Sequence, residues 1–379
     1  MRPRILFIVQ LPPPVHGVTM MNKYTVDHNW YKRHYETKTL PLHFGQRLED
    51  IGKITPGKLF HMAAFIGRLC YIMISFRPSL VYFTIVPTGK IFFRDALFTW
   101  VIKLFRPRIL FHLHKKGVEE IVRQSRFKRW LYKKTFRGAG VICLSERLTH
   151  DIRSVYKRRP YILPNGIDVV KNTILKPHNQ VPRIIFLSNL LKAKGILVLL
   201  QSLAELHRQG CRFTARVVGE PVDYSLEEAR EFCLKEGMAD VVQVIGPRFG
   251  NDKFSELRHA DIFVLPSYNE CVPLSILEAM QFGLAVVSTT VGGIPDIIRH
   301  GQTGLLTRPG HVKELSVTLR QLIADSCLRT KLGNNARESF LQHYTLDYFY
   351  EGLSNIFDEV LGHCRKNKEM PHLHDVASL

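Results

Sequence analysis

Residues 260–283 read ADIFVLPSYNECVPLSILEAMQFG, and this stretch carries the strongest fold signal in the chain. The short apolar run 262–265 is followed by turn residues, which predicts a strand that is buried on both faces. After a loop, Pro273 can occupy the first turn of a helix that runs through Phe282, with Gly283 at its C-cap. A strand, a loop and a helix in this order predict part of a βαβ unit.

Similar apolar runs recur along the whole chain, bounded by turn residues and separated by stretches with a helical pattern. In the second half they begin about 20–30 residues apart, which suits the length of βαβ units. The runs lie at residues 4–9, 80–86, 109–113, 141–144 and 161–163, and then at 183–187, 215–218, 241–245, 262–265 and 284–288. We therefore predict an α/β protein with two Rossmann-like, doubly wound parallel-sheet domains. Ligands bind beyond the carboxyl ends of such strands, so two sheets facing a cleft can hold two substrates.

The domain boundary is predicted from a turn signal, Pro164-Asn165-Gly166-Ile167-Asp168, and from the few large apolar residues in the stretch that follows. We expect a first domain over 1–170, a linker over 171–182, a second domain over 183–342, and a C-terminal helix with a polar tail over 343–379. We expect the C-terminal helix to pack back on the first domain.

The charge of the chain is distributed unevenly. The 379 residues have a net charge of +20. Residues 1–175 carry 31 Lys and Arg against 10 Asp and Glu, whereas residues 176–379 carry 22 against 23. The excess in the first half indicates a polyanionic partner, such as nucleic acid, an anionic membrane or a phosphorylated substrate. The 7 cysteines include no CxxC pair, which argues against a disulfide scaffold or a zinc site and favours a reducing cytoplasm.

Signatures of several other protein classes are missing from the sequence. Neither half has GxGxxG after its first strand, and no P-loop lysine signature occurs. The N-terminal apolar run is short and is interpreted as a first strand rather than a signal peptide. The stretch 59–76 has Arg68 near its middle, which disfavours a membrane span. It is interpreted as a helix packed in an α/β domain or, alternatively, as one that dips into a bilayer surface.

The segment 270–280 combines two carboxylates with a predicted helix start. The backbone amides of Val272, Leu274 and Ser275 would point from the helix N-terminus and suit a phosphate. Glu270 precedes the helix and Glu278 lies inside it, so both carboxylates can reach one ligand from different depths. Carboxylates bind paired sugar or ribose hydroxyls well, and the amides between them suit a diphosphate.

These residues resemble the E-x7-E motif of retaining glycosyltransferases of the GT-B fold and GT4 type, a group that includes the hexosyltransferases of lipopolysaccharide and capsule assembly. The resemblance is dense from residue 189 to 309 and sparser in the first half. It is carried by Lys194-Gly195, Val217-Val218-Gly219, 260–267, Glu270 to Met280, Val291-Gly292-Gly293-Ile294-Pro295 and 301–306, and by 12–18, 111–114 and 163–168. It implies a nucleotide-diphosphate sugar of UDP or GDP type as donor, held by the second domain, with no cofactor.

The resemblance also implies roles for single residues. Glu270 should contact the donor hexose, Glu278 the nucleotide ribose and Lys194 the diphosphate. A lysine suits this position because its compact cation can neutralise charge on a leaving diphosphate. Gly17 should allow close approach of the backbone to a phosphate.

Asn189 departs from the family pattern, since it stands where an Arg is usual. One leaving-group cation is then missing, although Asn can still donate a hydrogen bond; Lys192 and Arg248 are candidates to compensate. No D-x-D sequence occurs, which removes the usual carboxylate pair for a metal-bound diphosphate. We therefore predict a transferase without a metal site, in which Lys194 and helix amides take the role of the metal.

His114 matches the family histidine at the end of a strand of the first domain, near the reacting carbon of the donor sugar. His112 projects to the same face because side chains alternate along a strand, and His114 is preferred because it lies nearer the carboxyl end. The following Lys115 and Lys116 could bind an anionic acceptor or lie in a solvated loop.

A basic and aromatic-rich segment at 123–137 predicts a cationic helix. Its composition suits an interfacial helix on an anionic leaflet, and an ordinary solvated face is the alternative. Nucleic acid is disfavoured because no recognition motif accompanies the charges. The residues expected to face acceptor or membrane are Lys115, Lys116, Arg126, Arg129, Trp130, Lys133 and Lys134.

Taken together, these patterns predict a retaining hexosyltransferase that uses a nucleotide sugar and a lipid-linked or surface-polysaccharide acceptor. It would act in the cytoplasm, peripherally associated with the inner membrane. Two alternatives stay open: a nucleotide-sugar 2-epimerase of the same fold, and a non-enzymatic protein with a degenerate site that binds anionic lipid or another polyanion.

Overall fold

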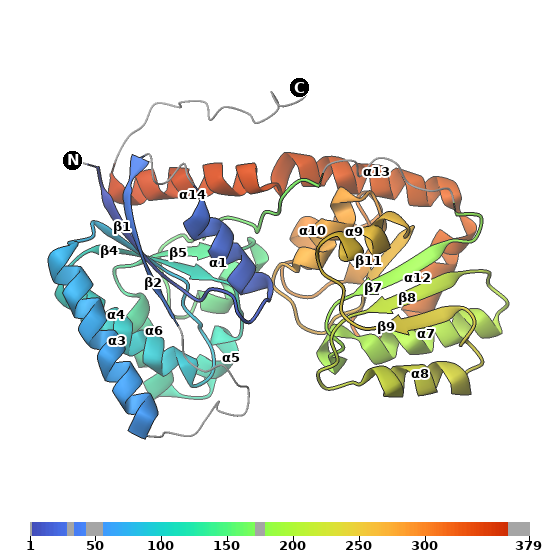
Figure 1. Ribbon diagram of the computed structural model, residues 1–379, viewed down its shortest axis with the longest axis horizontal. Coiled ribbons are helices and arrows are strands. Elements are labelled where there is room, and N and C mark those ends of the chain that lie inside the picture. The colour runs from blue at the N-terminus through green and yellow to red at the C-terminus, as the bar shows by residue number, and fades with distance from the viewer. Residues whose placement is uncertain (1, 29–33, 43–55, 171–178, 363–379) are drawn as a thin grey trace. The chain divides into compact units, whose positions relative to one another are not determined.

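The computed structural model describes residues 2–28, 34–42, 56–170 and 179–362 (Figure 1). The chain divides into two compact units, one of Met1–Pro164 with Phe349–Leu379 and one of Asn165–Tyr348. Each unit contains a six-stranded sheet whose neighbouring strands are all parallel. The prediction of two doubly wound parallel sheets is confirmed.

The unit boundary differs from the predicted one. The sequence places it at residue 170, whereas the chain passes into the second unit after Pro164. The reason is local, because Asn165 Nδ2 donates to the Val272 carbonyl at 3.1 Å and the Val170 N–H donates to Gln281 Oε1 at 3.0 Å. The return to the first unit, predicted at residue 343, begins at Phe349. Residues 171–178 of the linker and 363–379 of the tail lie outside the described residues.

The first unit has the strand order β2-β1-β3-β4-β5-β6. Its strands are β1 (Arg4–Val9), β2 (Glu36–Pro41), β3 (Leu80–Phe83), β4 (Arg108–Leu113), β5 (Gly140–Cys143) and β6 (Tyr161–Ile162). Its helices are α1 (Gly17–Asp27), α3 (Pro56–Ser75), α4 (Ile91–Leu104), α5 (Val118–Arg123), α6 (Arg126–Phe136) and the 3₁₀ helix η2 (Arg147–Ile152). The edge strand β2 escaped prediction because Leu40 is its single buried side chain.

Helix α14 (Leu346–Leu361) supplies aromatic side chains to the first unit from Phe349 onward. The Phe357 ring lies 5.9 Å from the Tyr82 ring, centroid to centroid. Tyr35 Oη donates to Asp358 at 2.6 Å, a buried bond that joins α14 to the segment before β2. Edge-on aromatic pairs of this kind add about 0.5–1.5 kcal/mol beyond the burial of their area.

The second unit has the strand order β12-β11-β10-β7-β8-β9. Its strands are β7 (Arg183–Leu187), β8 (Thr214–Val218), β9 (Val242–Ile245), β10 (Ile262–Leu265), β11 (Ala285–Thr289) and β12 (Leu305–Thr307). Its helices are η3 (Lys192–Lys194), α7 (Ile196–Arg208), α8 (Leu226–Lys235), α9 (Gly250–Arg258), α10 (Leu274–Gln281), α11 (Ile294–Ile297), α12 (Val312–Ala324) and α13 (Ser326–His343). The central strands are buried along their whole length, as their unbroken apolar sequences predict.

Helix α10 begins and ends close to the predicted positions, with one change at each end. Pro273 is the N-cap rather than a residue of the first turn, and the helix ends at Gln281. The Gly283 N–H bonds to Met280 O at 2.9 Å, and the Leu284 N–H bonds to Ala279 O at 3.1 Å. With Gly283 at φ +63°, these bonds form a Schellman cap and confirm the predicted glycine stop.

The stretch 59–76 forms most of α3, whose Leu69, Ile72 and Met73 are buried against the first sheet. Among the described residues, no helix combines the length and apolarity that crossing a membrane requires. Tyr71 and Ile74 of α3 are nevertheless exposed, so the helix keeps a second, outward apolar face.

Candidate active site

The carboxyl edge of the second sheet brings Glu270 and Lys194 together. Lys194 Nζ donates to Glu270 Oε1 at 2.6 Å, and Ser267 Oγ donates to the same oxygen at 3.0 Å. The Glu270 side chain is 8% exposed and that of Lys194 26%, so the pair is largely withdrawn from water but open on one side. Thr289 Oγ1 donates to the Ser267 carbonyl at 2.7 Å and fixes the loop from β11.

Two glycines allow the backbone to approach closely at this edge. Gly195 follows η3 with φ +80°, and a Cβ there would lie 2.0 Å from the Pro266 carbonyl oxygen. Gly219 follows β8, where a Cβ would lie 1.8 Å from the Ser188 carbonyl oxygen. These close approaches pack the loops after β7, β8 and β10 into one group, and they leave no room for a side chain at either glycine. This packing holds Lys194 against Glu270.

The N-terminus of α10 lies in the same loop group. Pro273, its N-cap, provides no side-chain hydrogen bond, so the amides of Leu274 and Ser275 are left uncapped. Uncapped amides at a helix N-terminus attract anions. Val272 is buried, and its carbonyl is held by the Asn165 amide. The three predicted phosphate-binding residues are therefore held differently: Asn165 fixes Val272, whereas Leu274 and Ser275 lie in the uncapped first turn of the helix.

Glu278 has a partner that the sequence did not reveal. Lys253 Nζ of α9 donates to Glu278 Oε1 at 2.6 Å, and both side chains are mostly buried. Burial raises the pKa of Glu278, and the Lys253 ammonium acts against that rise. In the described residues, each glutamate of the motif thus has its own lysine. Asn189 follows β7 and is exposed, as are Lys192 and Arg248.

The first unit has a small cavity of about 70 Å³ at the carboxyl ends of β1, β3 and β4. His16, Thr84, His114 and Lys115 are among its lining residues. Gly17 begins α1 directly after His16, whose Nδ1 accepts from the Thr19 N–H at 3.4 Å as part of a capping box. His16 therefore caps this helix.

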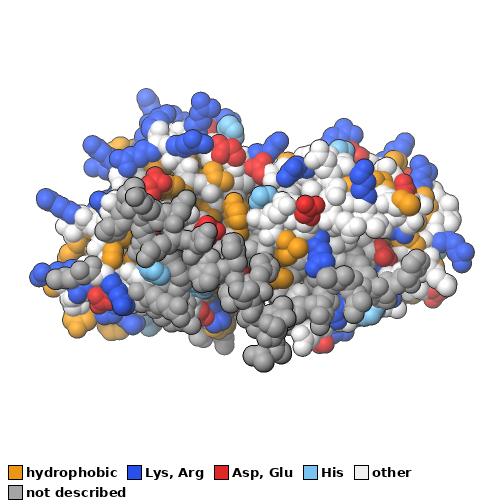
Figure 2. Space-filling model, turned by 90° about the horizontal axis from the view of Figure 1, so that it is seen from above, with side chains coloured by type: hydrophobic (Ala, Val, Ile, Leu, Met, Phe, Trp, Pro, Cys, Tyr) orange, Lys and Arg blue, Asp and Glu red, His pale blue; other side chains and the backbone are white. Residues whose placement is uncertain are grey.

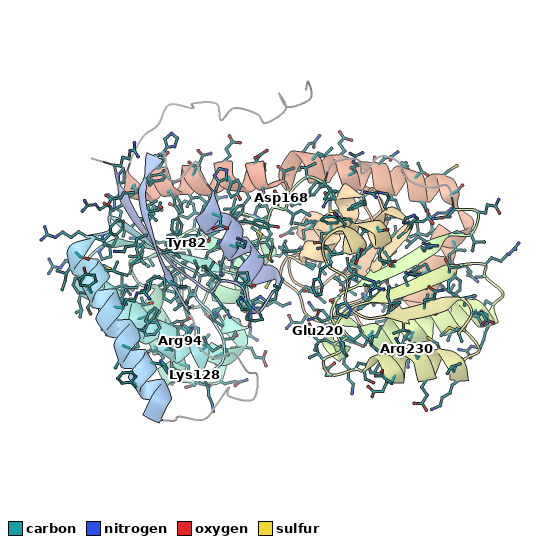
Figure 3. The ribbon with its side chains drawn as sticks, viewed as in Figure 1. Tyr82, Arg94, Lys128, Asp168, Glu220 and Arg230 are labelled. Carbon is teal, nitrogen blue, oxygen red and sulfur yellow. The ribbon has the colours of Figure 1, made fainter. Side chains whose placement is uncertain are left out.

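His112 and His114, at the carboxyl end of β4, form a buried pair with ring centroids 4.2 Å apart. His112 Nδ1 lies 2.6 Å from the hydroxyl of Tyr82, which is labelled in Figure 3. Burial lowers the pKa of His114 to about 3 and that of His112 well below its usual value, so both rings are neutral at pH 7. Nε2 of His114 has no hydrogen-bond partner in the described structure, and His114 lines the cavity whereas His112 does not.

Lys115 and Lys116 follow His114, the first exposed and the second half-buried. Burial lowers the pKa of His16, and the Lys115 charge lowers it further. This places the Lys115 charge near the His16 ring, on the rim of the cavity. The two lysines are thus in different environments, and Lys115 is the one that lines the cavity.

Helix α6 has one buried and one basic face. Leu131, Tyr132, Thr135 and Phe136 are buried, whereas Phe127 is 64% and Trp130 49% exposed. The predicted Arg126, Arg129, Lys133 and Lys134 are all exposed, and Lys134 Nζ lies 5.8 Å from the Trp130 ring centroid. Arg94 of α4 and Lys128 of α6 are labelled in Figure 3. Seen from above in Figure 2, Lys and Arg side chains lie on both units.

The part of the chain that the structure describes contains no group of three or more His, Cys, Asp or Glu that could hold a metal ion.

Residues 171–339 match a family model described as Glycosyl transferases group 1. An uncharacterized glycosyltransferase of Methanocaldococcus jannaschii is 24% identical over 260 residues, which cover 68% of this chain and 70% of that protein. A D-inositol 3-phosphate glycosyltransferase of Corynebacterium efficiens is 34% identical over 158 residues, which cover 40% of this chain and 37% of that protein. The second relative is thus matched over little more than a third of its own length.

Two solved structures share the fold. Sucrose-phosphate synthase from Thermosynechococcus elongatus has a TM-score of 0.73 at 18% identity and covers 95% of this chain and 100% of that one. HepE of Anabaena, solved in complex with UDP and glucose, has a TM-score of 0.68 at 19% identity and covers 94% of this chain and 100% of that one. Both likenesses place the chain in the GT-B fold of two Rossmann-like domains. The span that the family model matches lies within the second unit.

Proposed function

We propose that this chain is a retaining glycosyltransferase that moves a hexose from a nucleotide-diphosphate sugar to a lipid-linked or surface-polysaccharide acceptor. The observation that carries the proposal is the hydrogen-bonded cluster of Lys194, Glu270 and Ser267 beside the uncapped start of α10. It provides a cation, sugar-binding oxygens and anion-binding amides in one loop group, within the span that matches the family model.

Each part of this cluster suits one part of the donor. The amides of Leu274 and Ser275, with the Lys194 ammonium, suit the diphosphate. The Glu270 carboxylate can accept from hydroxyls of the hexose while it keeps Lys194 in place. Glu278 suits the ribose hydroxyls, and Asn189 can donate to a phosphate oxygen without adding charge.

In the proposed reaction, the acceptor oxygen forms a bond to the anomeric carbon, and the bond from that carbon to the diphosphate breaks. The acceptor proton passes to the leaving diphosphate on the same face, so the configuration is retained without a protein nucleophile. Lys194 and the α10 amides stabilise the charge that grows on the diphosphate. Because Glu270 holds Lys194 beforehand, little reorganisation is needed at that moment.

His114 is assigned to the sugar as a neutral hydrogen-bonding group. With a pKa of about 3, its ring stays uncharged at neutral pH, so it supports the sugar rather than acting as a cationic acid. Its Nε2, which has no partner in the described structure, is the atom proposed to bond a sugar hydroxyl.

No metal ion is required in this proposal, since Lys194 and the helix amides supply positive charge at the diphosphate. We expect transfer to persist in EDTA. Loss of activity in EDTA that Mn²⁺ restores would contradict this part of the proposal.

The acceptor is proposed to approach at the cytoplasmic face of an anionic membrane, on which the first unit docks. The support is the outward face of α6, where Phe127 and Trp130 are exposed among Arg and Lys side chains. Exposed aromatic groups within a cationic face are typical of interfacial helices.

A thermal-shift panel of UDP- and GDP-sugars tests the donor site. A ligand at 100 times its Kd should stabilise the protein by about 2.7 kcal/mol. Lys194→Ala should abolish the shift, and Lys235→Ala, which breaks an exposed Lys–Glu pair, should leave it unchanged. Turnover of the donor without acceptor would favour a 2-epimerase. Binding to acidic vesicles without any nucleotide-sugar binding would favour a non-enzymatic lipid-binding protein.

A further inference from the structure

Three neighbouring strands of the first sheet begin with nearly the same sequence. RPRILF occurs identically at residues 2–7 and 106–111, and RPSLVYF at 77–83. These segments lead into β1, β4 and β3, which are adjacent in the order β1-β3-β4. Each strand therefore enters the sheet after an Arg-Pro pair.

Backbone hydrogen bonds hold these strand starts side by side. The Ser79 N–H donates to Arg4 O at 2.8 Å, and the Arg108 N–H donates to Ser79 O at 3.1 Å. Arg77 has φ +46°, in the left-handed region that non-glycine residues rarely adopt. The parallel register thus concentrates arginines from three distant parts of the chain on one sheet edge.

The arginines surround a cavity of about 1120 Å³. Arg2, Arg4, Arg77 and Arg108 line it, and Glu36 is the one carboxylate among its lining residues. Arg4 Nε donates to Glu36 at 2.8 Å, and the Arg108 guanidinium donates to the Val360 carbonyl of α14. Figure 1 shows the start of β1 beside the end of α14, and Leu361 at that end of the helix is part of the lining. Arg77 makes no side-chain hydrogen bond or ion pair with the described residues.

This cavity is separate from the one at His114. The strands are parallel, so Arg108 at the start of β4 and His114 after its end lie on opposite edges of the sheet. A strand of 6 residues spans about 20 Å at roughly 3.3 Å per residue. A ligand at the arginine edge therefore does not overlap the sugar-binding groups.

We propose that the arginine cavity binds a ligand that carries two or more phosphate groups. The arginine fork matches phosphate oxygens in pairs. With four arginines and one carboxylate, the lining has a net positive charge. A ligand that carries one carboxylate would not neutralise this charge. Ser79 and Thr37 add hydroxyl donors. The phosphates can come from a soluble polyphosphate compound or from a phosphorylated lipid headgroup, since both have this chemistry.

The test is titration of the full chain with inorganic tripolyphosphate by calorimetry at constant ionic strength. We expect saturable binding that Arg77→Asn weakens at least tenfold; asparagine tolerates a left-handed backbone, so the fold is kept. Arg106→Asn is the matched control. Arg106 also precedes a proline and also has a left-handed backbone, with φ +57°, but it does not line the cavity. It should change binding by less than twofold.

Glu36→Gln provides a test with the opposite sign. It removes the single carboxylate of the lining and releases the Arg4 guanidinium, so tripolyphosphate should bind more tightly, by about tenfold. A contact that only stabilised the fold would not produce this gain.

Competition by vesicles containing phosphatidylinositol bisphosphate distinguishes the two sources of phosphate. Displacement of tripolyphosphate assigns the cavity to a lipid headgroup, and its absence assigns it to a soluble polyphosphate compound. The proposal is overturned by equal losses in Arg77→Asn and Arg106→Asn, by binding of a poly-glutamate peptide in preference to tripolyphosphate, or by lack of saturable binding to both phosphate probes.

Discussion

The two parallel sheets place different chemistry at their carboxyl ends. In the second unit the edge holds buried charges in pairs, Lys194 with Glu270 and Lys253 with Glu278. In the first unit the corresponding edge holds two neutral, buried histidines beside the exposed Lys115, and further basic side chains lie on helix α6. Both sheets are six-stranded and parallel although their strand orders differ, so the residues in the loops after the strands, rather than the sheet architecture, determine the chemistry at each edge.

The largest effect is expected from removing the cation of the second unit. Lys194→Ala should lower kcat/KM for sugar transfer by about 10²- to 10³-fold, because a preorganised group that stabilises leaving-group charge has a contribution of that size. Steady-state kinetics with the donor identified in the thermal-shift panel provide the measurement. Lys235→Ala should retain full activity, and a similar loss in both variants would refute the assignment.

The glycine packing that supports this site can be tested separately from its charge. Gly195→Ala should lower the free energy of unfolding by about 2–4 kcal/mol, because its Cβ would overlap the Pro266 carbonyl and its φ is +80°. Gly237→Ala is the control: φ is +66° and no atom lies within 4 Å of its Cβ, so only the backbone cost of about 1 kcal/mol remains. Urea unfolding of both variants measures the difference, and equal losses would show that the overlap is relieved.

The sequence predicted the parts of this comparison that depend on local pattern. The run at 262–265 predicted a buried strand, and the turn residues around Pro273 and Gly283 predicted α10 to within one residue at each end. The lysine partner of Glu278 could not be predicted, because Lys253 lies on another helix and no spacing links the two. The repeated Arg-Pro starts were visible in the sequence, but only the strand order makes them neighbours.

The charge of the first unit should govern its binding to membranes. The double variant Lys133→Ala/Lys134→Ala should bind phosphatidylglycerol vesicles about 30-fold more weakly, at roughly 1 kcal/mol for each lysine near an anionic surface. Cosedimentation provides the measurement, with Lys235→Ala/Lys313→Ala of the second unit as a control of equal charge. Donor binding should stay unchanged in both double variants. Because exposed charges are screened by salt, high salt should weaken vesicle binding far more than donor binding, and equal sensitivity would undo the division between the units.

The neutral state of the first unit's histidines gives a smaller, pH-dependent effect. Burial lowers the pKa of His114 from 6.5 to about 3, so below pH 6.5 the unfolded chain takes up a proton that the folded chain does not. Stability should therefore fall as the pH drops from about 6.5 towards 3, by up to about 1.4 kcal/mol for each pH unit. His112 acts in the same direction. His114→Gln removes one such site, so the decline in urea stability between pH 6.5 and 5.5 should become shallower. An unchanged slope in His114→Gln would show that this ring is protonated in the folded protein, and the neutral sugar-bonding role proposed for it would then fail.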